Sequence, residues 1–134
     1  MNPRVIKTLV VDDDQNMRQL VGTILRHQFP EIGIIESCDG MRAMRELLAN
    51  KIDIILCDLY MPGMNGLELL EVVRSSEHER IRLARFLMIT SASDKKMVES
   101  ARGLKVDDYI LKPFNGVELC ERLGSILRKI DPNN

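Results

Sequence analysis

Cysteine is scarce in this sequence, and its placement excludes the sites that depend on it. The three cysteines are Cys38, Cys57 and Cys120, and their spacing matches no metal-binding pattern. An odd number of scattered cysteines also gives no disulfide framework, and no signal peptide is evident. This usage is typical of a reducing compartment, so we expect a cytoplasmic protein.

The sequence also lacks a long apolar run and an excess of either charge. Its longest apolar runs are far shorter than a bilayer span. The 19 basic and 20 acidic residues give a net charge of −1, so nothing global favours nucleic acid or an anionic membrane as a partner. With 45% hydrophobic residues, the 134-residue chain is expected to be one domain, residues 1–134, with its core between about residues 5 and 130. We expect a monomer.

Five apolar, largely β-branched stretches predict strands, and the segments between them predict helices. The strands are expected at residues 5–11, 32–36, 52–58, 86–90 and 108–111. Apolar residues recur at helical spacing near residues 17–25, 40–50, 66–74, 94–104 and 116–130. Strands that alternate with helices five times predict an α/β fold, a parallel sheet covered on both faces.

Helix starts and core faces can also be predicted locally. Capping-box spacing places Asn65 and Asn115 at two helix starts, and Ser93 or Asp94 is expected to cap another. The apolar stripes are expected to pack on the sheet; they include Leu20 in the first helix and Met41, Met44, Leu47 and Leu48 in the second. The charged segment 75–85 is expected to be a helix end followed by an irregular surface connection.

Polar residues follow four of the five predicted strands. Asp12 and Asp13 follow the first strand, Asp58 the third, Thr90 the fourth and Lys112 the fifth. Right-handed crossovers bring the carboxyl ends of parallel strands to one edge of the sheet, where ligands bind. We therefore expect these five side chains to converge on one small site.

The residue types at this edge indicate phosphoryl chemistry with a divalent cation. Clustered carboxylates repel one another unless a cation binds them, and Mg²⁺ suits one or two carboxylates with waters and a phosphate oxygen. Lys112 is a suitable point charge for that phosphate. Asp58, delivered by an apolar strand to a turn, is then a candidate nucleophile, as in aspartyl-phosphate chemistry.

Taken in order, these residues resemble the receiver domain of two-component response regulators. The matching set is Asp12-Asp13, Asp58 with Met61-Pro62-Gly63 and Gly66, Thr90, and Tyr109 with Lys112-Pro113-Phe114. The resemblance covers nearly the whole chain and is closest to stand-alone, chemotaxis-type receivers. It implies a flavodoxin-like three-layer sandwich, in which a five-stranded parallel sheet of order 2-1-3-4-5 is combined with five helices.

The resemblance also implies a role for each residue near the acid. Asp58 would accept a phosphoryl group from a histidine kinase. Asp12, Asp13 and Asp58, together with the backbone carbonyl of Tyr60, would bind Mg²⁺, with Mn²⁺ as an alternative. Lys112 would pair with the phosphoryl group.

Three further expectations follow from the family. The Lys112–Pro113 peptide bond would be cis. Thr90 would be a switch hydroxyl drawn toward the phosphate, and Tyr109 would be the aromatic side chain that changes rotamer with it. Such a protein is a switch that promotes only its own phosphorylation and dephosphorylation, and it is not otherwise an enzyme.

The resemblance places the output at residues 93–129, which include the fourth helix, fifth strand and fifth helix. We expect no DNA-binding output domain and therefore expect a protein partner: a flagellar motor switch component, a kinase or a histidine phosphotransfer protein. The last of these would make the chain a phosphorelay intermediate. A receiver belonging to a longer regulator stays open as well, and neither the kinase nor the pathway can be predicted.

The chain departs from the family pattern at two positions, and two rival functions are alternatives to a receiver. Ser91 stands where alanine is usual, and Lys105 stands where glycine is common, so a left-handed backbone at Lys105 would cost about 1–2 kcal/mol. An aspartate-nucleophile phosphatase would need a second acid two residues after Asp58, and the chain has Tyr60 at that position. A flavin or nucleotide carrier would need a phosphate-binding loop, which the acids 12–14 oppose and for which no GxGxxG or P-loop pattern exists.

Overall fold

A parallel β-sheet forms the centre of the computed structural model, which describes residues 5–91 and 95–130. Its strands are β1 (Lys7–Val11), β2 (Gly33–Ser37), β3 (Ile54–Asp58), β4 (Arg85–Ser91) and β5 (Asp108–Lys112). The helices are α1 (Gln15–Gln28), α2 (Gly40–Ala49), α3 (Gly66–Arg74), α4 (Glu79–Arg82), α5 (Lys95–Gly103) and α6 (Gly116–Ile130). The strand order is β2-β1-β3-β4-β5 and every pairing is parallel, which confirms the predicted fold.

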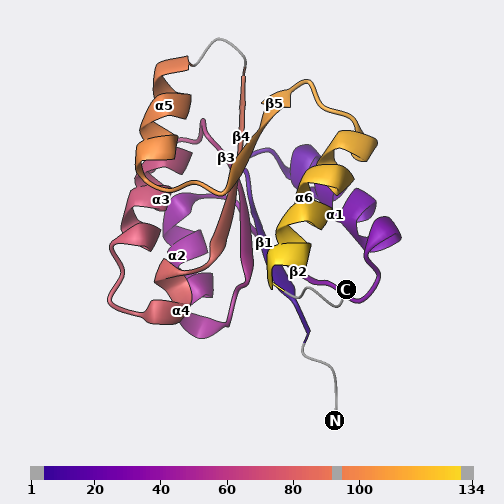
Figure 1. The fold of residues 1–134 in the computed structure, drawn as a ribbon, viewed down its shortest axis with the longest axis horizontal. Helices are drawn as coiled ribbons and strands as arrows, with labels where there is room; N and C mark the ends of the chain where they lie inside the picture. The colour runs from indigo at the N-terminus through magenta and orange to yellow at the C-terminus, as the bar shows by residue number, and fades with distance from the viewer. Residues whose placement is uncertain (1–4, 92–94, 131–134) are drawn as a thin grey trace.

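Helices cover both faces of this sheet and make three layers. Figure 1 shows α1 and α6 on one face and α2, α3, α4 and α5 on the other. Two separate apolar clusters fill the two interfaces. Ile54 and Leu56 of β3 belong to the cluster under α1 and α6, whereas Ile55 and Cys57 belong to the opposite cluster. A strand at the centre of such a sheet is buried on both faces, which is why β3 is apolar throughout until Asp58.

The structure corrects the prediction for segment 75–85. Six helices are found among the described residues rather than five, because this segment contains the short helix α4. Ile81 is its one buried side chain, and it packs into the cluster on the α2–α5 face of the sheet. A four-residue helix is too short to show a repeating apolar stripe. Its other residues are charged, so the sequence pattern did not indicate that Ile81 is buried.

The predicted core faces are largely confirmed, with three exceptions. Leu20, Met41 and Leu48 are 51%, 62% and 53% exposed. Each lies at the margin of its helix's apolar stripe, beside residues such as Val21 and Leu47 that are almost wholly buried. Helical periodicity locates a stripe, but the neighbouring elements decide how much of its width is covered.

Two local predictions can be checked against the backbone. The Asn65 side chain accepts a hydrogen bond from the Glu68 N–H at 2.8 Å, and the Glu68 carboxylate accepts one from the Asn65 N–H at 3.1 Å, which completes a capping box. Lys105 has a φ of 63°, so the strain expected at that position is present. The expected cap at Ser93 or Asp94 lies outside the described residues. Among the helices described, none combines the length and apolar character needed to span a membrane.

Candidate functional site

Asp58 is the last residue of the central strand β3 and lies at the carboxyl end of the sheet. The residue is only 6% exposed. The register pairs it with Ile89 of β4, one residue before Thr90. The fold therefore places a largely buried carboxylate between β1 and β4, where the ends of neighbouring strands can reach it.

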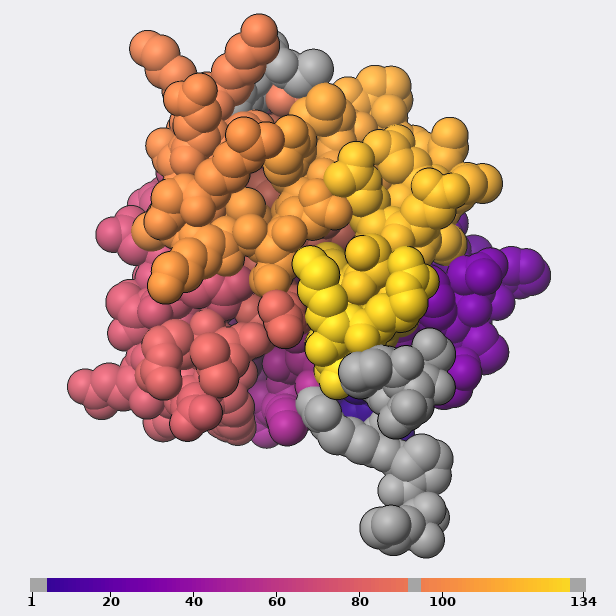
Figure 2. Space-filling view, in the orientation of Figure 1, coloured from indigo at the N-terminus to yellow at the C-terminus, as the bar shows by residue number. Residues whose placement is uncertain are grey.

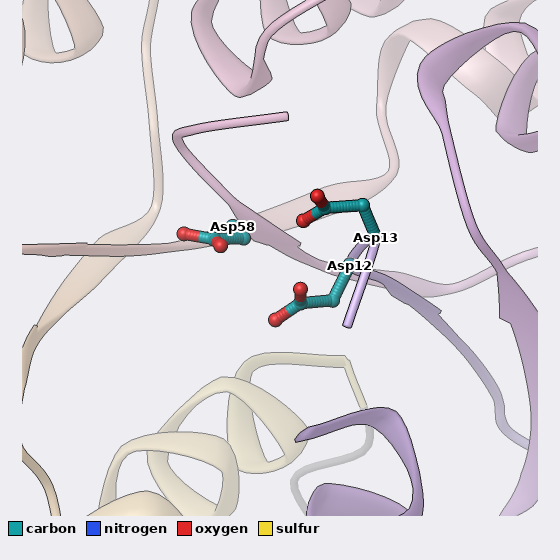
Figure 3. Close-up of side chains that lie close together, drawn as sticks. All are labelled: Asp12, Asp13 and Asp58. Carbon is teal, nitrogen blue, oxygen red and sulfur yellow. The ribbon is translucent and has the colours of Figure 1, made fainter. Parts of the chain in front are cut away.

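Two further carboxylates from the end of β1 lie beside Asp58. Single carboxylate oxygens of Asp12, Asp13 and Asp58 all lie within 4.8 Å of one another. Figure 3 shows Asp12 and Asp13 projecting from adjacent chain positions toward the side of Asp58. The sequence prediction that these three acids converge is therefore matched by the geometry.

The ionised form of Asp12 is disfavoured in this cluster. Asp12 is 2% exposed, and its Oδ1 accepts the Asp14 N–H at 2.9 Å while its Oδ2 has no hydrogen-bond partner among the described residues. The pKa of Asp12 is raised to about 6, chiefly by burial and also by the charges of Asp58 and Asp13, while the Asp14 N–H and Lys112 act in the opposite direction. An ionised, unpartnered oxygen in this position favours a bound cation.

Lys112 brings a positive charge to the same edge. It ends β5, and its Nζ lies 3.2 Å from Oδ2 of Asp58, with one third of its side chain exposed. The Lys112–Pro113 peptide bond is cis, the isomer that the family resemblance implies. A lysine from the outermost strand thus reaches the central acid across the end of β4.

Thr90 and Tyr109 lie on β4 and β5, and the hydrogen bonds of their hydroxyl groups among the described residues go to other partners than the carboxylates. Thr90 is 1% exposed, and its hydroxyl donates to the Ser91 carbonyl at 3.5 Å. Tyr109 is half-buried, and its hydroxyl accepts a hydrogen bond from Arg102 of α5 at 3.1 Å. The Arg102 guanidinium also lies 5.5 Å from the ring centroid, a cation–π arrangement.

The remaining predicted metal ligand is the backbone carbonyl of Tyr60. Two side-chain contacts near the site, made by Arg18 and Arg102, were not predicted from the sequence. Tyr60 follows β3 with its side chain 55% exposed, and it is the carbonyl, not the ring, that the prediction concerns. Arg18 donates from Nη1 to the Asp12 carbonyl at 2.6 Å. No sequence spacing links Arg18 or Arg102 to the site, so the contact of Arg18 with Asp12 and that of Arg102 with Tyr109 are found only in the tertiary structure.

The comparisons with known proteins agree with this geometry. The family model described as "Response regulator receiver domain" matches residues 8–124. The chain belongs to this family. Receivers of this kind are signalling switches of two-component systems rather than general catalysts.

Similar receivers occur both alone and within longer regulators. Over 128 residues the chain is 33% identical to chemotaxis protein CheY-3 of Vibrio cholerae, an alignment covering 93% of this chain and 94% of that protein. It is equally identical to response regulator ArlR of Staphylococcus saprophyticus, with 96% of the chain aligned, but spans only 55% of that protein. The crystal structure of Vibrio cholerae CheY4 superposes with a TM-score of 0.83 at 25% identity, covering 92% of this chain and 99% of that one.

The acidic cluster of this receiver fits a divalent cation. Three carboxylates supply hard oxygen ligands within one small region, and the buried Oδ2 of Asp12 lacks a donor among the described residues. Mg²⁺ binds through one or two carboxylates and keeps several waters, so it needs no complete protein cage. Asp12, Asp13 and Asp58 are the residues that would hold it.

Replacing the most buried of these acids should stabilise the metal-free receiver. In chelator, Asp12→Asn is expected to raise the free energy of unfolding by about 2 kcal/mol, because a pKa raised from 3.8 to about 6 reflects charge held at a cost. The same variant should lose most of the stabilisation that millimolar Mg²⁺ gives the parent protein. Urea unfolding with and without Mg²⁺ measures both effects.

The control for this variant is Asp39→Asn, a partly buried acid outside the cluster that caps α2 by accepting the Arg42 N–H at 2.8 Å. Asparagine caps a helix as well as aspartate does, so this change should leave both measurements unaltered. An Asp12→Asn protein that still responded fully to Mg²⁺ would contradict the assignment of Asp12 to the cation.

Proposed function

We propose that this receiver is a phosphorylation switch whose acceptor is Asp58. The observation that carries the proposal is the convergence of three strand ends: a carboxylate cluster within 4.8 Å and a lysine 3.2 Å from its central member. A buried carboxylate with one cationic partner and two acidic neighbours is a candidate functional group, because binding of a cation or addition of a phosphoryl group would change the net charge of the site.

The reaction is an in-line phosphoryl transfer. A carboxylate oxygen of Asp58 attacks the phosphorus of a phosphohistidine on the kinase, the new O–P bond forms as the P–N bond breaks, and the imidazole leaves. Mg²⁺ bound by Asp12, Asp13, Asp58 and the Tyr60 carbonyl would offset negative charge on the phosphoryl oxygens. The chain itself contributes positioning, because the sheet fixes Asp58 and Lys112 on strands two places apart.

Lys112 would exchange partners during this step. Its ammonium group lies against Asp58 in the described state, and the new phosphoryl oxygens would replace that carboxylate oxygen as its counter-charge. The acyl phosphate carries about −1.5 to −2 of charge in place of the single charge of the carboxylate, at a site that holds two further acids. Thr90, which follows the Ile89 that pairs with Asp58 on the neighbouring strand, is the proposed hydroxyl donor to this group.

Readout would pass through Tyr109 on β5. In the described state Arg102 holds the tyrosine hydroxyl at 3.1 Å, and a movement of Thr90 toward the phosphate would open space for the ring to move. Partners that bind the α5–β5–α6 face would then distinguish the two states, because a partner shifts such an equilibrium only through its differential affinity. The proposed partners are a histidine kinase and a downstream protein. We further propose that residues 1–134 act as one receiver unit.

The direct test is incubation with acetyl phosphate and Mg²⁺, a small-molecule donor that needs no cognate kinase. Intact-mass spectrometry should show one phosphoryl group added per chain, and peptide mapping should place it on Asp58. Chelator should prevent the adduct, because the carboxylate cluster would then repel the donor. If no adduct formed under any Mg²⁺ concentration, the proposed function would be wrong.

A further inference from the structure

The end of the sheet opposite Asp58 carries a concentration of cationic side chains. A depression of about 430 Å³ between α4 and the α5–β5 connection is lined by Arg74, Arg82, Arg85 and Lys105, with Asp107 as its only acid. Figure 1 shows α4 at the end of the molecule away from the carboxyl ends of β4 and β5. This depression therefore has no part in the phosphorylation site.

A second depression of about 560 Å³ continues the same surface. It is lined by Lys51, Arg80 and Lys129 with the acids Asp53 and Glu79, and it shares Leu83 and Arg85 with the first. We call the two together the basic surface. Seven cationic side chains face three acidic ones there, in a chain whose net charge is −1.

Two of the three acids are engaged within the protein. Asp107 pairs with Arg74 at 3.0 Å and Arg85 at 3.1 Å, and it accepts the Phe86 N–H at 2.7 Å. Asp53 is 7% exposed and accepts the Lys7 N–H at 3.0 Å. The basic surface therefore keeps an excess of four cationic side chains over acidic ones, and two of its arginines already share Asp107.

The arginines are held in place by the backbone. Arg74 donates to the carbonyls of Lys105, Arg82 and Ala84 at 2.6–3.1 Å, which ties α3 to the connections before β4 and β5. Arg80 donates to the Leu48 carbonyl at 2.8 Å. A fixed set of guanidinium groups loses little side-chain entropy when a ligand binds, which favours recognition.

Exposed leucines lie among these cations. Leu83 is 63% exposed and lines both depressions, and Leu48, whose carbonyl holds Arg80, is 53% exposed. Figure 2 shows α4 and its flanking residues as a lobe at the lower left, with the α5–β5 chain above it. The lobe belongs to segment 75–85, which contains α4.

We propose that the basic surface docks an acidic segment of a partner protein, with an apolar side chain of that segment packed on Leu83. Charge complementarity selects the acidic partner, and the exposed leucine between two cationic depressions selects one that also carries apolar residues. Nucleic acid fits less well, because no aromatic side chain lines either depression to stack on bases. The proposal does not depend on phosphorylation of Asp58.

The test uses a fluorescent synthetic peptide of repeating glutamate and leucine, together with the 134-residue chain. Binding should shift the backbone amide resonances of Leu83, Lys105 and Lys51, and should weaken with salt. Lys51→Glu with Lys105→Glu should lower affinity by about tenfold or more, since two close charge pairs become repulsive. Leu83→Ser should lower affinity without changing the salt dependence.

The matched control is Lys95→Glu with Lys96→Glu, which makes the same change in net charge on exposed residues of α5. It should leave peptide affinity unchanged, and the milder pair Lys51→Gln with Lys105→Gln should give an intermediate loss. Equal loss in the control would overturn the proposal, because the binding would then follow net charge alone. Tighter binding to a DNA duplex or to phosphatidylglycerol vesicles than to the peptide would overturn it as well.

Discussion

Asp58→Asn should abolish phosphorylation by acetyl phosphate, leaving no adduct detectable by intact-mass spectrometry. The amide cannot serve as the attacking oxygen, and the neighbouring acids Asp12 and Asp13 extend from a different strand end. The variant should fold, because asparagine has nearly the same volume and replaces one of three mutually repelling charges. We expect this to be the largest functional effect of any single substitution in the chain.

The control for this change is Asp53→Asn, which alters another largely buried acid, 7% exposed, just before the same strand. Its amide oxygen can still accept the Lys7 N–H, so phosphorylation should proceed as in the parent protein. An adduct of undiminished yield on Asp58→Asn would mean that another side chain is the acceptor, and it would remove the central assignment.

Gly66→Ala should cost about 3 kcal/mol of stability and slow phosphorylation together. A Cβ at this position would lie 2.6 Å from the Asp58 carbonyl oxygen and 3.0 Å from Cα of Leu59, both backbone atoms that cannot rotate away. The first turn of α3 therefore packs directly against the residue that carries the acceptor. Pushing that backbone aside should move the carboxylate relative to Lys112, so urea unfolding and the rate of adduct formation should both change.

Gly124→Ala is the matched control, because it makes the same chemical change within α6. A Cβ there would be 3.6 Å from the Arg128 side chain and 3.9 Å from Phe29, ordinary contact distances. It should stabilise the helix by about 0.5–1 kcal/mol and leave the phosphorylation rate unaltered. If Gly66→Ala were equally harmless, the close approach of α3 to Asp58 would not constrain the site.

Much of the site could be predicted because parallel α/β folds convert sequence order into spatial convergence. Asp12, Asp58 and Lys112 are far apart in the chain, yet each ends or directly follows a strand, and right-handed crossovers bring those ends to one edge. The side chains that depend on packing could not be predicted in this way. The contact of Arg102 with Tyr109, and that of Arg18 with the Asp12 carbonyl, are set by how helices lie on the sheet.

The same distinction separates the two ends of the molecule. The sequence by itself determined the α/β class, the strand ends and the acids among them, because strand periodicity and residue chemistry are local properties. Only the tertiary structure decided that α4 forms, that Leu48 and Leu83 are exposed, and that cations from five separate segments gather around Asp107 and Asp53. Surface neighbours are chosen by how elements pack, and no local pattern in the chain encodes that packing.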